Sequence, residues 1–306
     1  MATIAKKPDP TMGVFDGFDP KALYQMIPVG GSRTGFSVTT TQSPISVTIE
    51  PTGIARFGGR RSFNPPTSLP FDDNSMELAP ASVATFDLVG VTEGKALMVV
   101  RLRDGTFIEA LDISVKNVVR KTYSLCLLND MFRRSPWYPP NDPTNIGPPP
   151  PAFVTVRPLM ERVKLVFRQQ CNLELLEGVS NVFELNLNDK DLKDPIVLDA
   201  IIPPSTMTNQ QLIIDAIPTH AFGSNFIVIF TWDIREKRKS DLAGLNIGVF
   251  CFIDSVSANR SYVVAHELGH AMGLLHRGQD VLMNPAPNSS LLARFEIDTL
   301  NAGGTT

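Results

Sequence analysis

Residues 266–276 decide how the C-terminal half of the chain is interpreted, and they read His266-Glu267-Leu268-Gly269-His270-Ala271-Met272-Gly273-Leu274-Leu275-His276. Three of the four histidines of the chain lie in this stretch. Residues i and i+4 of a helix project from one face, so His266 and His270 can present their imidazoles to one metal ion. Gly273 can adopt the left-handed conformation that ends a helix, and the turn brings His276 round as a third ligand.

The residue types in this pattern indicate a catalytic zinc site. Imidazole is an ordinary ligand of Zn²⁺, and three protein ligands leave one coordination position open, as catalytic sites do. Glu267 follows the first ligand and is placed to act on a metal-bound water. A bare H-E-x-x-H also occurs by chance in unrelated helices, but the longer pattern is far more specific. The sequence therefore predicts one catalytic Zn²⁺ on His266, His270 and His276, with Glu267 as general base.

The same stretch matches the signature H-E-x-x-H-x-x-G-x-x-H of metzincin zinc peptidases. Val281-Leu282-Met283-Asn284-Pro285 resembles the Met-turn of that family, and the spacing is most similar to that of the matrixin-like branch. The resemblance implies that Met283 lies structurally beneath the metal. It also implies an endopeptidase that hydrolyses peptide bonds of protein substrates with a zinc-bound water activated by Glu267. For residues 117–306 it implies a twisted mixed sheet, a long helix, an active-site helix and a C-terminal helix.

Substrate contacts are also expected from the resemblance. An extended peptide would pair, main chain to main chain, with an edge strand near Gly248–Ile253, which makes Gly248, Val249 and Phe250 candidate substrate-binding residues. Pro285 would flank the cleaved bond. The chain departs from matrixins in having a single further histidine, His220, which is expected in a loop or core.

Residues 25–116 are expected to form an all-β sandwich. Short segments rich in Val, Ile, Phe and Thr alternate with turn residues, and Asp104-Gly105 suits a tight hairpin. This segment resembles bacterial immunoglobulin-like domains in its length and in its closing hairpin. Pro65-Pro66 and the run Gly58–Arg61 predict a long internal loop. Residues 1–24 lack sustained periodicity and are interpreted as a tail or docking segment.

The second domain is expected to span 117–306 and to make the whole chain α+β. A strand is predicted near Tyr123–Leu127, and helices and further strands alternate after it. The Pro-rich stretch 136–151, with seven prolines in its last thirteen residues, has two interpretations. It is an interdomain linker, or it is a loop within the second domain, which we favour because the preceding strand needs a sheet to join.

Composition narrows the functional classes. The formal net charge of −3 argues against a nucleic-acid or anionic-membrane surface. Three scattered cysteines form no disulfide framework. No apolar run approaches the length of a membrane span, and no ordinary signal peptide is visible. A cytoplasmic location in the producing cell is expected.

Two functional alternatives stay open. One is export by a signal-peptide-independent route, as an effector or toxin whose N-terminal region contacts secretion machinery or an inhibitor. The other is a non-catalytic binding or adhesion protein with a structural zinc site. Glu267 argues against the second, because a site that only supports the fold does not need that carboxylate.

Overall fold

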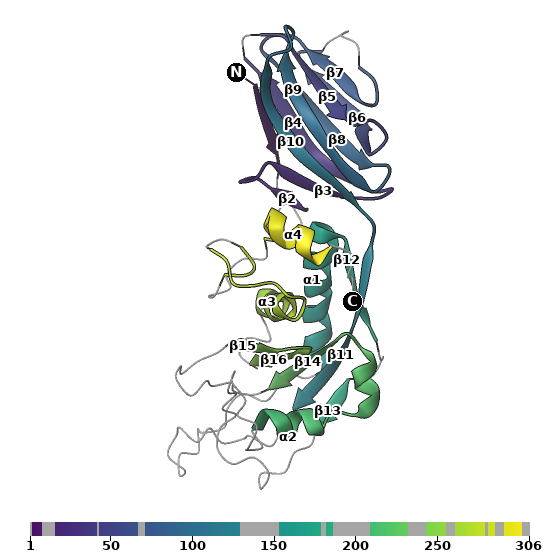
Figure 1. Cartoon of the computed structure of the whole chain (residues 1–306), viewed down its shortest axis with the longest axis vertical. Coiled ribbons are helices and arrows are strands. Elements are labelled where there is room, and N and C mark those ends of the chain that lie inside the picture. Colours follow the sequence, from purple (N-terminus) through teal and green to yellow (C-terminus); the bar gives the residue numbers. More distant parts are fainter. Residues whose placement is uncertain are drawn as a thin grey trace. The chain divides into compact units, whose positions relative to one another are not determined.

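The computed structural model describes residues 2–7, 16–41, 43–66, 71–128, 153–178, 182–185, 209–231, 243–254, 261–278, 281–284 and 291–301 (Figure 1). The chain is mixed α+β and rich in strands, as the sequence predicted. It divides into two compact units. The first comprises Met1–Val119, Arg168–Leu173 and Leu291–Thr306, and the second comprises Arg120–Phe167 and Glu174–Ser290. The Pro-rich stretch 136–151 lies outside the described residues.

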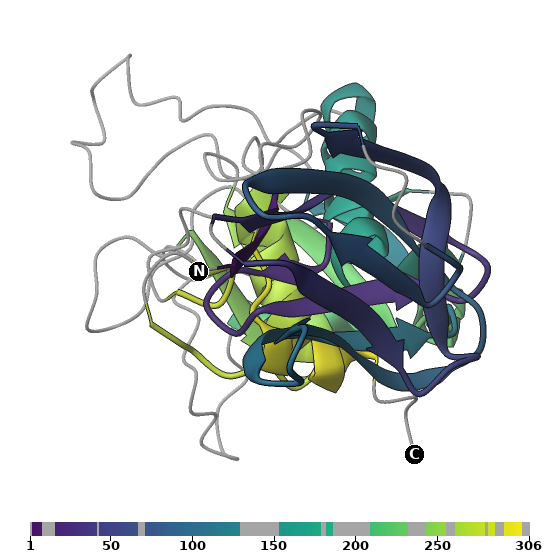
Figure 2. The same ribbon diagram turned by 90° about the horizontal axis from the view of Figure 1, so that it is seen from above.

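The first unit holds two sheets, seen from above in Figure 2. The four-stranded sheet has the order β1 (Ala2–Lys6), β4 (Ser32–Thr40), β8 (Ser82–Gly90) and β6 (Ala55–Asn64). The six-stranded sheet has the order β2 (Phe18–Asp19), β3 (Tyr24–Pro28), β10 (Phe107–Lys116), β9 (Gly94–Leu102), β5 (Ile45–Glu50) and β7 (Ser75–Leu78).

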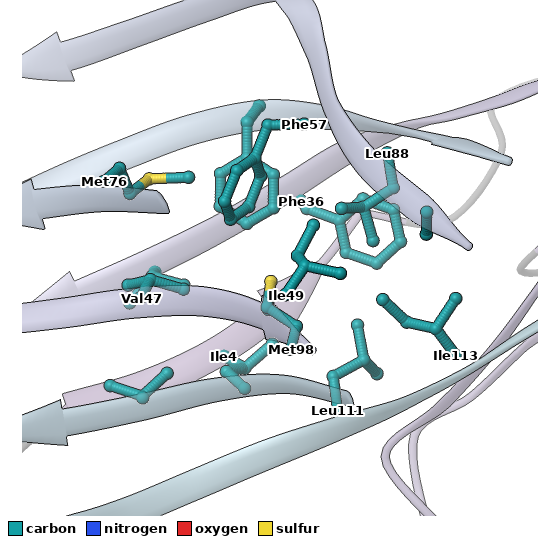
Figure 3. Close-up of a cluster of buried hydrophobic side chains, with 14 of the residues drawn as sticks. Ile4, Phe36, Val47, Ile49, Phe57, Met76, Leu88, Met98, Leu111 and Ile113 are labelled. Carbon is teal, nitrogen blue, oxygen red and sulfur yellow. The ribbon is translucent and has the colours of Figure 1, made fainter. Parts of the chain in front are cut away.

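One apolar core joins the two sheets of this unit. Strands such as β5 and β8 alternate between buried and more exposed residues, so each sheet turns one apolar face inward. Figure 3 shows inward side chains from both sheets together, among them Phe36, Phe57, Met98 and Ile113. Asp104-Gly105 forms the predicted hairpin between β9 and β10, with φ of +91° at Gly105. The two-sheet arrangement predicted for residues 25–116 is therefore present.

Two predictions for this unit are wrong. The described parts of residues 1–24 are not a tail, because Ala2–Lys6 pair antiparallel with β4 and the segments β2 and β3 extend the six-stranded sheet. The inward residues Ala2 and Ile4 are buried, which explains the pairing. Gly58–Arg61 is no loop either. It lies within β6, where the pairing with β8 shifts register in a bulge.

The second unit is built on a mainly parallel sheet. Its order is β12 (Leu173–Glu177), β11 (Val119–Leu128), β14 (Phe226–Thr231), β16 (Phe250–Asp254) and β15 (Gly244–Ile247), and β13 (Phe183–Leu185) also pairs with β11. Strands β11, β14 and β16 are parallel, whereas β15 runs antiparallel to β16. The helices are α1 (Phe153–Cys171), α2 (Asn209–Asp215), the short 3₁₀ helix η1 (Thr219–Gly223) and α3 (Ser261–Ala271). The predicted long helix is α1, although it begins before Pro158, which lies inside it.

A hairpin replaces the single edge strand expected near Gly248–Ile253. Strands β15 and β16 are joined by a turn in which Gly248 has φ of +61°. Strand β16 pairs with β14 on one side and β15 on the other, so β15 forms the edge of the sheet. The edge of this sheet is therefore Gly244–Ile247, and the strand near Gly248–Ile253 that was expected at the edge is internal.

The predicted C-terminal helix is α4 (Arg294–Leu300), but it groups with the first unit rather than with the rest of 117–306. Arg294 forms an ion pair with Asp112, and the Tyr24 hydroxyl donates to Asp298 at 3.0 Å. These polar contacts attach the helix to β3 and β10. Among the described helices, none has both the length and the apolar character needed to cross a membrane.

Candidate metal centre

Helix α3 and the turn that ends it carry the histidine group. His266 and His270 lie one turn apart on α3, and Gly273, with φ of +89°, ends the helix. The Gly273 amide donates to the His270 carbonyl and the Leu274 amide donates to the Gly269 carbonyl, both at 2.9 Å. These two bonds form a Schellman motif, which reverses the chain after the helix. The reversal returns His276 to the first two histidines, as the sequence predicted.

The three imidazoles converge through their Nε2 atoms. The Nε2 distances are 3.1 Å from His270 to His266, 3.0 Å from His270 to His276 and 3.3 Å from His266 to His276. A tetrahedral ion with bonds of 2.0–2.1 Å would separate its ligands by about 3.3–3.4 Å. The observed triangle is close to that size, so the group could hold a metal ion.

Backbone carbonyls orient two of the rings. His266 Nδ1 lies 2.7 Å from the Leu282 carbonyl oxygen, and His270 Nδ1 lies 2.8 Å from that of Leu274. A carbonyl oxygen only accepts, so each Nδ1 donates and each neutral ring keeps its Nε2 lone pair for a cation. Burial lowers the pKa of His266 to about 4, which keeps that ring in the neutral, metal-binding form.

Glu267 follows the first ligand, His266, on α3 and is almost completely buried, with 6% of its surface exposed. Desolvation raises the pKa of its carboxyl to about 8. Gly244 of β15 lies directly against its side chain. A buried carboxyl on the helix that carries two of the three nitrogen donors is a candidate proton-transferring group, and such shifted pKa values are common at functional sites.

Met283 packs beneath the histidine helix. It is fully buried, and a methyl group at Gly269 would come within 2.6 Å of its sulfur, so only glycine allows this approach. The Arg277 amide donates to the Met283 carbonyl at 2.8 Å. Residues 281–284 therefore support the centre through the Met283 side chain and through the Leu282 carbonyl that orients His266.

The other sequence-predicted residues are placed differently. Gly248 and Val249 lie in the β15–β16 turn, and Phe250 begins the internal strand β16. Pro285 lies outside the described residues. His220 is exposed in η1 and packs edge to face on Phe183 with centroids 4.7 Å apart, as a loop histidine would.

Sequence reasoning missed four contributors to the centre. The carbonyls of Leu274 and Leu282 are main-chain groups, which carry no residue signature. Gly244 is far from the motif in sequence and gives no signal until the strand is placed. Gly269 is part of the motif, one helical turn before Gly273, but its close contact with Met283 was not predicted.

Comparisons with known proteins identify no family for this chain. No family model matches and no curated protein matches. Among solved structures, domains 4 and 5 of the S-layer protein SbsC match at 18% identity over 29% of this chain and 45% of that chain, with a TM-score of 0.20. The bacterial hydrophobin BslA matches at 8% identity over 38% of this chain and 97% of that chain, with a TM-score of 0.21.

A family 123 glycoside hydrolase from Clostridium perfringens matches at 10% identity over 41% of this chain and 30% of that chain, with a TM-score of 0.20. The chain spans less than half the length of the S-layer chains that it matches. At these TM-scores the likenesses carry no conclusion about function.

Proposed function

We propose that the chain is a zinc-dependent endopeptidase of the metzincin type, most similar to the matrixin-like branch. The observation that carries this proposal is the convergence of the His266, His270 and His276 Nε2 atoms, together with the burial of Glu267, the residue that follows His266. Three nitrogen donors with two rings fixed by backbone carbonyls suit Zn²⁺. The packing of Met283 under Gly269 of the histidine helix adds support, because the family resemblance implies that this methionine lies beneath the metal.

The reaction follows from the donor set and the carboxyl. A zinc ion on the three imidazoles would polarise the scissile carbonyl and acidify water. Glu267 would take the proton of the attacking water and deliver it to the leaving amine. Its burial excludes bulk water from that transfer.

An extended polypeptide is the substrate that the second unit favours. Strand β15 is the edge of the sheet, and edge strands offer unpaired backbone groups to an added strand. Helix α3 packs against β15 and β16, and Gly244 at the start of β15 touches Glu267. A peptide paired with β15 would therefore pass close to the proposed base.

The proposal is tested by cleavage of an unfolded protein and a mixed peptide library by wild type and Glu267→Gln. Glutamine keeps the shape but cannot accept the proton, so activity should fall roughly 10²–10⁴-fold while zinc content is unchanged. Glu161→Gln is the matched control, because Glu161 is exposed on α1 and pairs with Lys164. Equal cleavage by wild type and Glu267→Gln would refute the mechanism. A zinc-loaded wild type that cleaves nothing would instead favour a binding or adhesion protein.

A further inference from the structure

Gly244 and Glu267 are in unusually close contact. A methyl carbon at Gly244 would lie 2.6 Å from Glu267 Cγ, 2.7 Å from Oε1 and 2.9 Å from Cδ. Carbon atoms in ordinary contact lie about 3.5–4.0 Å apart. The absence of a side chain at Gly244 is therefore what makes room for the Glu267 carboxyl in this position.

Neither backbone can readily move away. Gly244 pairs with Ile253 in the β15–β16 ladder, and the Ala243 carbonyl accepts from the Asp254 amide at 3.1 Å. Glu267 lies in the middle of α3, among its buried residues. The end of the glutamate side chain is the most flexible part of this contact, so an added methyl group would displace the carboxyl before it displaced the strand.

We infer that Gly244 is a positioning residue, whose backbone forms the wall against which the Glu267 carboxyl is held. This inference rests on the proposed peptidase function. Gly244 does not have a left-handed φ, so alanine is compatible with its backbone and only the contact with Glu267 forbids it. The edge strand thus has a second role in addition to any pairing with substrate.

The test compares Gly244→Ala with Gly223→Ala in the same unit. Gly223 has no atom within 4 Å of an added methyl carbon, and its φ is not left-handed. A displacement of about 1 Å at a reacting group can cost up to about 10²-fold, so Gly244→Ala should lower kcat by about 10–100-fold. KM, zinc content and Tm should stay at wild-type values, a combination that a loss of structure would not give. Gly223→Ala should match wild type in kcat, KM, zinc content and Tm.

The same Gly244→Ala substitution in a Glu267→Asp variant tests whether the loss of kcat comes from the contact between residues 244 and 267. Glu267→Asp shortens the side chain by one methylene and withdraws it from Gly244, so adding Gly244→Ala there should change kcat by less than about twofold. Crystal structures of wild type and Gly244→Ala should show the carboxyl displaced by about 1 Å.

Two results would overturn the inference: a Glu267 carboxyl that stays in place in Gly244→Ala, or a kcat loss as large in the Glu267→Asp background as in wild type. If wild type cleaves no peptide, the proposed function fails, and the two crystal structures still decide whether Gly244 positions Glu267.

Discussion

Strands β8 and β14 bury their side chains in two different ways. In β8 of the sandwich, buried residues alternate with more exposed ones, whereas all six residues of β14 are buried. A sheet covered on one face produces the first pattern, and a parallel sheet covered on both faces produces the second. In the sandwich, the buried side chains of both sheets therefore pack into one apolar core. In the second unit, β14 is buried on both faces of its sheet. The buried carboxyl of Glu267 belongs to this unit.

Buried charge is also treated differently in the two units. In the sandwich the ammonium of Lys6 pairs with Asp16 and donates to Gln25, so the charge is neutralised where it is buried. In the second unit, burial of Glu267 raises the pKa of its carboxyl to about 8, with desolvation as the cause. Burying a carboxyl is costly for stability when it is ionised, and such costs are typical of functional sites.

The largest expected effect comes from removing β11, an internal strand that pairs with β13 and β14. A fragment of residues 117–306 should be soluble and bind zinc. A fragment of residues 152–306 should aggregate, because its sheet would expose two unpaired edges. Size-exclusion chromatography and zinc content check both. Equal folding of the shorter fragment would place the boundary near residue 151 and make the Pro-rich stretch a linker.

A truncation in the sandwich core should have the next largest effect. Phe86 stacks on Phe36 at 6.0 Å and meets Phe57 edge to face at 5.2 Å. Phe86→Ala should lower the free energy of unfolding by about 3–5 kcal/mol, since it leaves a cavity among these rings. Phe107→Ala is the control, because Phe107 is 62% exposed and should change stability by less than about 0.5 kcal/mol. Chemical denaturation measures both, and similar losses would mean that the core is not where the structure places it.

Two turn glycines, one in each unit, are expected to give smaller effects on stability. Gly105 in the sandwich and Gly273 after α3 both have left-handed φ and open space around an added methyl group. Alanine should therefore cost about 1–2 kcal/mol of stability at either position. Only Gly273→Ala should also weaken zinc binding, because that turn returns His276 to the centre. Zinc titration of both variants checks this, and an equal loss of affinity would show that the turn has no special role.

The sandwich strands were predictable where apolar and polar residues alternate over six or more positions, as in β5 and β8. Strand β1 was missed because it has five residues and its last inward position is Lys6, a charge that becomes buried only through its pairing with Asp16. The β15–β16 hairpin was missed because its residues read as one apolar run. The break lies at Gly248, whose φ of +61° is a conformation that glycine favours, but a glycine within an apolar run also fits a continuous strand.

The histidine centre was predictable because a helix of known period and one glycine turn fix where its three rings lie. The grouping of α4 with the first unit could not be predicted, since it depends on contacts of Arg294 and Asp298 with residues more than 180 positions away. Local pattern determines secondary structure and short motifs. Long-range polar contacts, such as Tyr24 with Asp298, decide which unit an element joins.

Elemental analysis of the purified protein tests most directly whether His266, His270 and His276 form a zinc centre. The account predicts about one zinc per chain in wild type and in Glu267→Gln, because the glutamate is not a ligand. It predicts almost none in the His266→Ala, His270→Ala double variant, with folding followed by circular dichroism. Zinc at wild-type content in the folded double variant would contradict the account.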